Sequence, residues 1–269
     1  MITDSEFQRI VTYMKKNYGI DLSQKRILVS GRLENYILRK GYAGYDDYMS
    51  RVEKNPNSQE ATDIVNVLTT NHTYFMRESA HFDYMRRIAL PWARAAAAKT
   101  KDLRIWCGAS STGEEPYTLA MVIHDFFGLD RNGWDTRILA TDISTRVLEH
   151  AAKGIYLKEQ VEPLPENWKR HYFKRLDEER YEVREELKKE VIYRQFNLMS
   201  PFPFKKKFHI VFLRNVMIYF QDDTKHELIR KIYDYMEPGG YLFIGTTESL
   251  DRKKIQFEYV QPSIYRKQG

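Results

Sequence analysis

The sequence contains a single cysteine, Cys107, among 269 residues. One cysteine cannot form an intrachain disulfide or a cysteine-rich zinc site, so we expect Cys107 to pack as a small core residue. The apolar runs are short and interrupted by charge, and the N-terminus lacks the basic and apolar regions of a signal peptide. We therefore expect a cytoplasmic protein that is not embedded in a membrane.

Several ligand-binding motifs are missing as well. The chain has no Gly-x-Gly-x-x-Gly fingerprint and no Gly-Lys-Ser/Thr phosphate loop, which argues against a nicotinamide oxidoreductase or a P-loop protein. The Asn/Asp-Pro-Pro-Tyr/Phe motif of nucleic-acid amino methyltransferases is also absent.

Positive charge is in excess, with 43 Lys and Arg against 37 Asp and Glu, a net charge of +6 and a pI near 9.1. This excess favours an acidic partner, but charge alone does not distinguish nucleic acid from an acidic protein surface. The length and the 42% hydrophobic content are sufficient for two cores.

Residues 1–84 have helical periodicity throughout. A capping box, Thr3 to Glu6, begins the first helix and Gly19 ends it, and a second helix over 24–40 is closed by Gly41. Apolar spacing predicts two further helices before residue 70. We predict a helical bundle followed by a linker, with the first domain spanning residues 1–84.

Strand and helix patterns alternate over residues 85–269. The predicted strands lie near 103–108, 137–142, 191–196, 209–214, 241–245 and 257–266, and the main helices near 113–127, 145–153 and 222–236. Such alternation predicts an α/β domain with a parallel, Rossmann-like sheet. It is interrupted at about 155–190 by prolines and dense charge, which indicates an insertion.

The most informative segment is WCGASSTGEEPY at residues 106–117, which joins a short strand to a helix through small residues. Gly108 and Gly113 let the backbone approach a ligand closely. Glu114 and Glu115 would repel a pyrophosphate at this helix N-terminus, so the loop suits a cationic ligand without phosphate, such as S-adenosylmethionine. The alternative is a loop in which the two glutamates only complement the helix dipole.

This segment resembles the STGEEPY signature of the CheR family, the chemotaxis receptor methyltransferases. Four further matches follow the family order: TNHTYFMRE at 70–78, ATDI at 140–143, FLRNVMIYF at 212–220 and GGYLFIGTTESL at 239–250. The resemblance covers essentially the whole chain. It implies an N-terminal helical bundle, then a Rossmann-like S-adenosylmethionine-dependent methyltransferase domain with a small inserted antiparallel subdomain, and esterification of receptor glutamates.

The resemblance also implies the cofactor-binding residues. They are Asn71, Thr73, Arg77, Glu115, Asp142, Asn197, Leu198, Asn215 and Val216. Asp142 ends a strand where an acid commonly binds ribose, but it lies 29 residues after Gly113, so spacing alone makes a helix cap equally plausible. Asn197 and Leu198 are implied to contact adenine, as are Asn215 and Val216, with turn formation as the alternative for each asparagine.

Arg77 and Tyr219 are the predicted catalytic residues. The planar fork of Arg77 matches a carboxylate, either that of the cofactor or that of the acceptor glutamate, whereas an isolated arginine is usually a solvated surface charge. Tyr219 either lines the transfer site or belongs to the core. A glutamate acceptor is already ionised at neutral pH, so the reaction requires neither a general base nor a metal.

Two regions are candidate partner sites. The basic helix 24–40 suits the acidic cytoplasmic helices of a chemoreceptor, and some family members use the inserted subdomain, here 155–190, to bind a receptor's C-terminal peptide. Each region has an ordinary solvated surface as its alternative. The competing functions are a nucleic-acid methyltransferase, although no nucleic-acid partner is expected, and a non-catalytic S-adenosylmethionine sensor.

Overall fold

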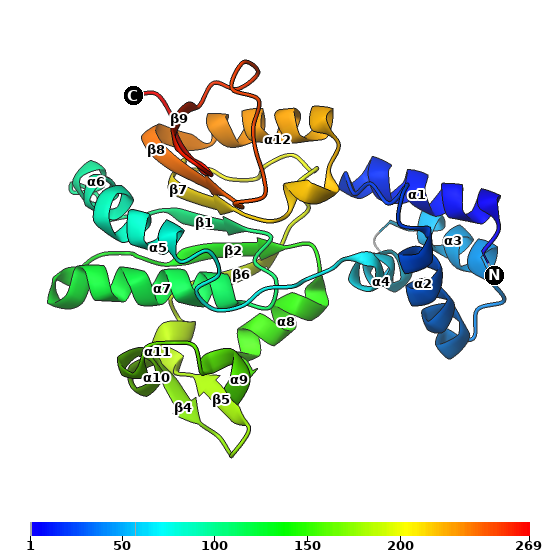
Figure 1. Ribbon diagram of the computed structural model, residues 1–269, viewed down its shortest axis with the longest axis horizontal. Helices are drawn as coiled ribbons and strands as arrows, with labels where there is room; N and C mark the ends of the chain where they lie inside the picture. The colour runs from blue at the N-terminus through cyan, green and yellow to red at the C-terminus, as the bar shows by residue number, and fades with distance from the viewer. Residues whose placement is uncertain (1, 57) are drawn as a thin grey trace.

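The computed structural model describes residues 2–56 and 58–269. A bundle of helices lies beside a twisted, mainly parallel sheet that is covered by helices, as Figure 1 shows. This architecture confirms the predicted order of a helical part followed by a Rossmann-like part. No helix in the two described ranges combines the length and the apolar character that a bilayer crossing requires.

The bundle contains four helices. They are α1 (Asp4–Tyr18), α2 (Arg26–Lys40), α3 (Tyr45–Lys54) and α4 (Gln59–Leu68). The predicted capping box at the start of α1 is formed, with Thr3 and Glu6 bonded reciprocally. Gly19 and Gly41 end α1 and α2 with φ values of 72° and 74°, in the left-handed region that favours glycine.

An irregular segment, residues 69–79, leads from α4 towards the sheet and is called the strap below. The helical run that follows consists of α5 (Ala80–Tyr84), the π-helix η1 (Met85–Ala89) and α6 (Leu90–Ala96). Phe82 of α5 stacks on Phe212 of the sheet at 5.9 Å between ring centroids. The strap therefore connects the bundle to helices that pack on the sheet.

The main sheet has the strand order β6-β2-β1-β7-β8-β10-β9. Its strands are β1 (Ile105–Gly108), β2 (Ile138–Asp142), β6 (Val191–Gln195), β7 (Phe208–Leu213), β8 (Met236–Ile244), β9 (Glu258–Gln261) and β10 (Ile264–Arg266). The helices α7 (Glu114–Phe127), α8 (Thr145–Lys153) and α12 (Asp222–Asp234) follow β1, β2 and β7. The order reverses direction beside β1, and ligands of open α/β sheets bind at the strand ends of such a point.

The interruption at 155–190 is a small subdomain built on a three-stranded antiparallel sheet, order β3-β5-β4. Its elements are β3 (Ile155–Leu157), α9 (Lys158–Val161), α10 (Glu166–Tyr172), β4 (Phe173–Arg175), β5 (Arg180–Val183) and α11 (Glu185–Lys188). The predicted insertion and its antiparallel character are thus confirmed.

One sequence prediction about the last strands was wrong, and another gave a strand that was too short. The single strand expected near 257–266 is a hairpin of β9 and β10, because Ser263 takes a positive φ of 65° and turns the chain back. The strand expected at 241–245 begins earlier, at Met236, where glycines and a proline had masked the extended pattern.

The pleat of the sheet divides the hydrophobic core in two. Trp106 of β1 belongs to the core that includes side chains of the bundle and α12, whereas its neighbour Cys107 belongs to the core that includes side chains of α5, α7 and the inserted subdomain. Alternate side chains of a strand point to opposite faces, so consecutive residues of one buried strand enter different cores. The buried Cys107 is the small core residue that the sequence predicted.

Trp106 gives a direct test of the first core. Its ring is completely buried and its indole N–H donates to the Thr141 hydroxyl at 2.9 Å. Thr141→Val removes this acceptor without changing the side-chain shape, and we expect unfolding in urea to show a loss of about 1–3 kcal/mol, the cost of an unpaired buried donor. Thr247→Val, at an exposed position, is the control. Equal stabilities of the two variants would contradict the prediction.

Candidate active site

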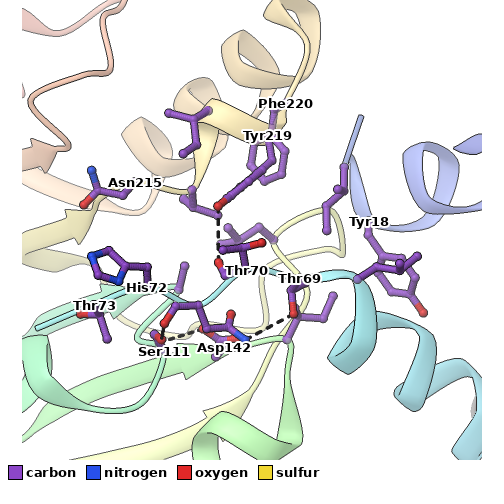
Figure 2. Close-up of a pocket in the computed structure, with 18 of the residues that line it drawn as sticks. Tyr18, Thr69, Thr70, His72, Thr73, Ser111, Asp142, Asn215, Tyr219 and Phe220 are labelled. Carbon is purple, nitrogen blue, oxygen red and sulfur yellow. Dashed lines mark hydrogen bonds between the residues drawn. The ribbon is translucent and has the colours of Figure 1, made fainter. Parts of the chain in front are cut away.

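A cavity of about 420 Å³ opens at the carboxyl ends of β1, β2 and β7, between the sheet and the bundle. Its volume lies within the range of small-molecule sites. Figure 2 shows the strap residues Thr70 and His72 passing between Tyr219 on one side and Asp142 on the other, with Tyr18 of α1 at the bundle end.

All ten site residues predicted from the sequence line this cavity. They are Asn71, Thr73, Arg77, Glu115, Asp142, Asn197, Leu198, Asn215, Val216 and Tyr219. The strap, the first turn of α7, the end of β2 and the segments that follow β6 and β7 contribute them. Residues separated by up to 148 positions in the chain therefore meet around one cavity, although their individual roles stay predictions.

Asp142 is buried, with 7% of its surface exposed, and ties the loop after β1 to the turn after β2. Its carboxylate accepts the backbone N–H groups of Ser111 and Ser144, each at 2.9 Å. Burial raises the pKa of Asp142, while these two N–H donors oppose that shift by favouring the anion. Each carboxylate oxygen has a second lone pair, which leaves capacity for a ligand hydroxyl.

Two residues that line the cavity, Arg214 and Glu115, belong to an ion-pair cluster. Arg214, at the end of β7, has a side chain that is 1% exposed and pairs with Glu78 at 3.0 Å and Glu115 at 2.7 Å. The same guanidinium donates to the backbone carbonyl of Arg77. The other oxygen of Glu115 accepts from Cys107 Sγ at 3.2 Å. One buried cation thus joins the strap to the first turn of α7.

Glu248 organises the turn that leads to Tyr219. Its carboxylate accepts backbone N–H groups from Gly245, Asn215, Met217 and Ile218 at 2.7–3.2 Å. Burial raises the pKa of Glu248, and the four donors act in the opposite direction by stabilising its anionic form. The Asn215–Ile218 turn is therefore held by a side chain from beyond the next strand.

Strained backbone is concentrated here. Of the seven non-glycine residues with positive φ in the described ranges, Ala109, Ser111 and Asn215 line the cavity, and Met76 and Glu78 lie on the strap beside Arg77, all with φ of 50–59°. The left-handed conformation costs roughly 1–2 kcal/mol for such a residue, and strain of this kind gathers at binding and catalytic sites.

Two predicted adenine-contacting residues already use their amides within the protein. Asn197 donates to the carbonyl of Asn17 at 2.8 Å and accepts from Met199 N at 3.0 Å, which joins the sheet to α1. Asn215 donates to Glu78 at 3.2 Å. The Asn197 amide thus makes the local contact of a turn, whereas the Asn215 amide bonds to the strap, and both residues line the cavity.

The predicted catalytic pair lies at the boundary between the two parts of the chain. Tyr219 donates to the carbonyl of Thr70 at 3.4 Å, and burial raises the pKa of its phenol although Arg77 and Arg32 lower it. Tyr219 is therefore a neutral donor at neutral pH. Arg77 lines the cavity and donates to the carbonyl of His72 at 2.7 Å.

The predicted basic helix 24–40 forms as α2 from Arg26, and its basic residues differ in their surroundings. Arg32 is not a free surface charge, because it donates to the carbonyl of Thr69 at 2.8 Å and to the hydroxyl of Thr70 at 3.2 Å. It stabilises the start of the strap. Arg39 and Lys40 of the same helix are exposed.

Sequence reasoning missed Arg214, Glu78 and Glu248 as organisers of the site. All three lie inside the quoted segments FLRNVMIYF, TNHTYFMRE and GGYLFIGTTESL. A signal was available at Arg214, which directly follows a run of apolar strand residues. A charge at such a position is expected to be buried, and a buried charge requires a partner of opposite sign.

Two family models match the two parts of the chain. Residues 5–69 match the family model "CheR methyltransferase, all-alpha domain", and residues 71–266 match "CheR methyltransferase, SAM binding domain". Among solved structures, the glycopeptide N-methyltransferase MtfA complexed with S-adenosyl-L-methionine is 17% identical, with a TM-score of 0.32 over 57% of this chain and 48% of that chain.

Full-length relatives have much higher identity. The chemotaxis protein methyltransferase of Borreliella burgdorferi is 37% identical, with 99% of this chain and 95% of the relative covered. The Escherichia coli protein of the same name is 34% identical, with 98% and 91% covered. Both family models and these relatives together extend over nearly all of the sequence, and the chain therefore belongs to the CheR methyltransferase family.

Proposed function

We propose that this S-adenosylmethionine-dependent methyltransferase transfers a methyl group to glutamate side chains in the cytoplasmic part of chemoreceptors. The products are glutamate methyl esters and S-adenosylhomocysteine, formed during chemotactic adaptation in the cytoplasm. One observation carries the proposal: all ten predicted binding and catalytic residues line one cavity between the bundle and the sheet. The names of the full-length relatives support a protein substrate in chemotaxis.

The charges of the cavity wall suit this cofactor. S-adenosylmethionine has a sulfonium and an ammonium against one carboxylate. In the proposed binding mode, Glu115 accepts from the ammonium, Asp142 from the ribose hydroxyls, and the backbone around Asn197 and Asn215 contacts the rest of the ligand. Glu115 keeps unused lone pairs beside Arg214 and Cys107, so it can accept another donor.

The chemistry then needs placement more than acid–base catalysis. A glutamate oxygen forms a bond to the methyl carbon as the carbon–sulfur bond breaks, and the bonding pair leaves with sulfur. Opposite charges on carboxylate and sulfonium are neutralised towards the transition state, which a dry, closed site favours. The cavity between the bundle and the sheet supports such a site.

Arg77 and Tyr219 are proposed to orient the acceptor. Tyr219 cannot serve as a base while its phenol is neutral, but it can donate a hydrogen bond. Arg77 is expected to hold a carboxylate loosely, because a tight pair would stabilise the ground state and reduce nucleophilicity. An alternative ligand for the same guanidinium is the cofactor carboxylate.

Two surfaces are proposed to bind the receptor. Arg39 and Lys40 of α2 would attract acidic receptor helices. The inserted subdomain, 155–190, is a proposed site for a receptor's C-terminal peptide, and its edge strands β3 and β4 are positions where an extended peptide can add to a sheet.

The proposed function is tested by incubating the protein with radiolabelled S-adenosylmethionine and either a chemoreceptor cytoplasmic fragment or RNA. We expect label on the receptor fragment that alkali releases as volatile methanol, because methyl esters are base-labile. Base-stable label on RNA would favour a nucleic-acid methyltransferase. Cofactor binding without transfer to either would favour a sensor.

Arg77→Ala should lower turnover on the receptor fragment roughly a hundredfold, because misplacing a reacting group by about 1 Å has effects of that size. Calorimetric titration with S-adenosylhomocysteine separates the two roles: unchanged affinity assigns Arg77 to the acceptor, and weakened affinity assigns it to the cofactor carboxylate. Arg87→Ala, at an exposed position on η1, is the matched control. Near-wild-type turnover of Arg77→Ala would contradict a role in transfer.

Charge reversal at Arg39 and Lys40 together should raise the KM for the receptor fragment about tenfold at low salt, since electrostatic steering acts mainly on association. Affinity for S-adenosylhomocysteine should not change. The double reversal Arg86→Glu and Arg87→Glu alters net charge equally on another surface and is the control. If both double variants have the same KM, α2 is not the docking surface.

A further inference from the structure

The inserted subdomain contacts the strap through one aromatic side chain, Phe75. The ring is 3% exposed and lies between two rings of the subdomain, Tyr156 of β3 and Phe173 of β4. The centroid distances are 4.9 Å and 5.6 Å, and both pairs are edge-to-face. Edge-to-face aromatic pairs attract each other more strongly than their buried area alone would predict, so these two rings fix the position of Phe75.

Phe75 lies two residues before Arg77, and the chain changes direction between them. Met76 has a φ of 59°, and its N–H donates to the Thr118 hydroxyl of α7 at 3.3 Å. This turn allows Phe75 to enter the core while Arg77 lines the cavity. A shift of the ring would therefore move the residue that carries the guanidinium.

The subdomain also supports the loop that follows β1. The Tyr156 hydroxyl donates to the carbonyl of Thr112 at 2.7 Å, and Gln160 of α9 donates to Glu114 at 3.2 Å. A Cβ on Gly113, where φ is 100°, would lie 2.7 Å from the Tyr156 hydroxyl. Loop and subdomain are thus in direct contact, and Tyr156 touches both the loop and Phe75.

We propose that Phe75 is a positioning residue for methyl transfer, and that the Tyr156 and Phe173 rings form the seat that fixes it. The inserted subdomain is then part of the active-site scaffold, in addition to any role in binding a partner. This inference rests on the proposed function because that function gives Arg77 its task at the reacting groups.

A matched pair of substitutions separates positioning from general stability. Phe75→Leu loosens the seat, whereas Phe127→Leu removes the same atoms from a side chain that is also 3% exposed and belongs to the same hydrophobic core. Phe127 ends α7, at the amino-terminal edge of the sheet and away from the cavity. A purely structural role predicts the same kinetics for both variants.

We expect Phe75→Leu to lower kcat on the receptor fragment roughly tenfold to a hundredfold, by misplacing Arg77. The KM for S-adenosylmethionine should stay within about threefold of wild type, because the loop that follows β1 keeps its hydrogen bond to Tyr156. Phe127→Leu should leave both constants near wild type. Phe173→Leu approaches the same seat from the subdomain, and it should reproduce the kcat defect even if Phe75→Leu does not fold.

Hydrogen–deuterium exchange gives a readout that does not depend on activity. Peptides covering residues 70–79 should exchange faster in Phe75→Leu and Phe173→Leu than in wild type or Phe127→Leu, with and without S-adenosylhomocysteine. Wild-type protein that fails to methylate the receptor fragment would count against the proposed function. The exchange rates of residues 70–79 would then be the only test of whether the seat fixes Phe75. Unchanged exchange in both seat variants, or equal kcat in Phe75→Leu and Phe127→Leu, would overturn it.

Discussion

The active site depends on one buried cation. Arg214 pairs with Glu78 on the strap and Glu115 on α7, and it also donates to the carbonyl of Arg77. Buried charges are costly to leave unpaired, so removing Arg214 would leave the carboxylates of Glu78 and Glu115 without their counter-charge, at about 3–5 kcal/mol. The cation therefore holds together the strap, the sheet and the first turn of α7, and Arg77, Glu115 and Arg214 itself line the cavity.

The sheet topology explains why these elements meet at this edge. Strands β2 and β6 extend the sheet on one side of β1, and β7 and β8 extend it on the other. The loops that follow their carboxyl ends diverge and leave a crevice, which the bundle covers from the side of α1 and α2. Strain in the crossing segments, at Met76, Glu78 and Ser111 among others, is sustained by the hydrogen bonds that hold them.

The local sequence pattern predicted the structure correctly where the interactions that determine it join residues close together in the sequence. The capping box of Thr3, the glycine ends of α1 and α2, and the helix that follows the STGEEPY loop were all predicted, because caps and periodicity act within a few residues. The hairpin at Ser263 was not, since a positive φ at a serine has no reliable sequence signal. Nor did the local pattern indicate the partners of Arg32, because Thr69 and Thr70 lie nearly forty residues away.

The sequence by itself determined the two-part fold, the inserted subdomain, the family and ten of the residues that line the cavity. These features follow from hydrophobic periodicity and from motifs that lie within short segments of the chain. Only the tertiary structure decided which charges are buried together, that Asn197 bonds α1, and that Phe75 is seated in the subdomain. Such pairings join residues about 80 to 180 positions apart, and their geometry is set by how the pleated sheet brings distant loops to one edge.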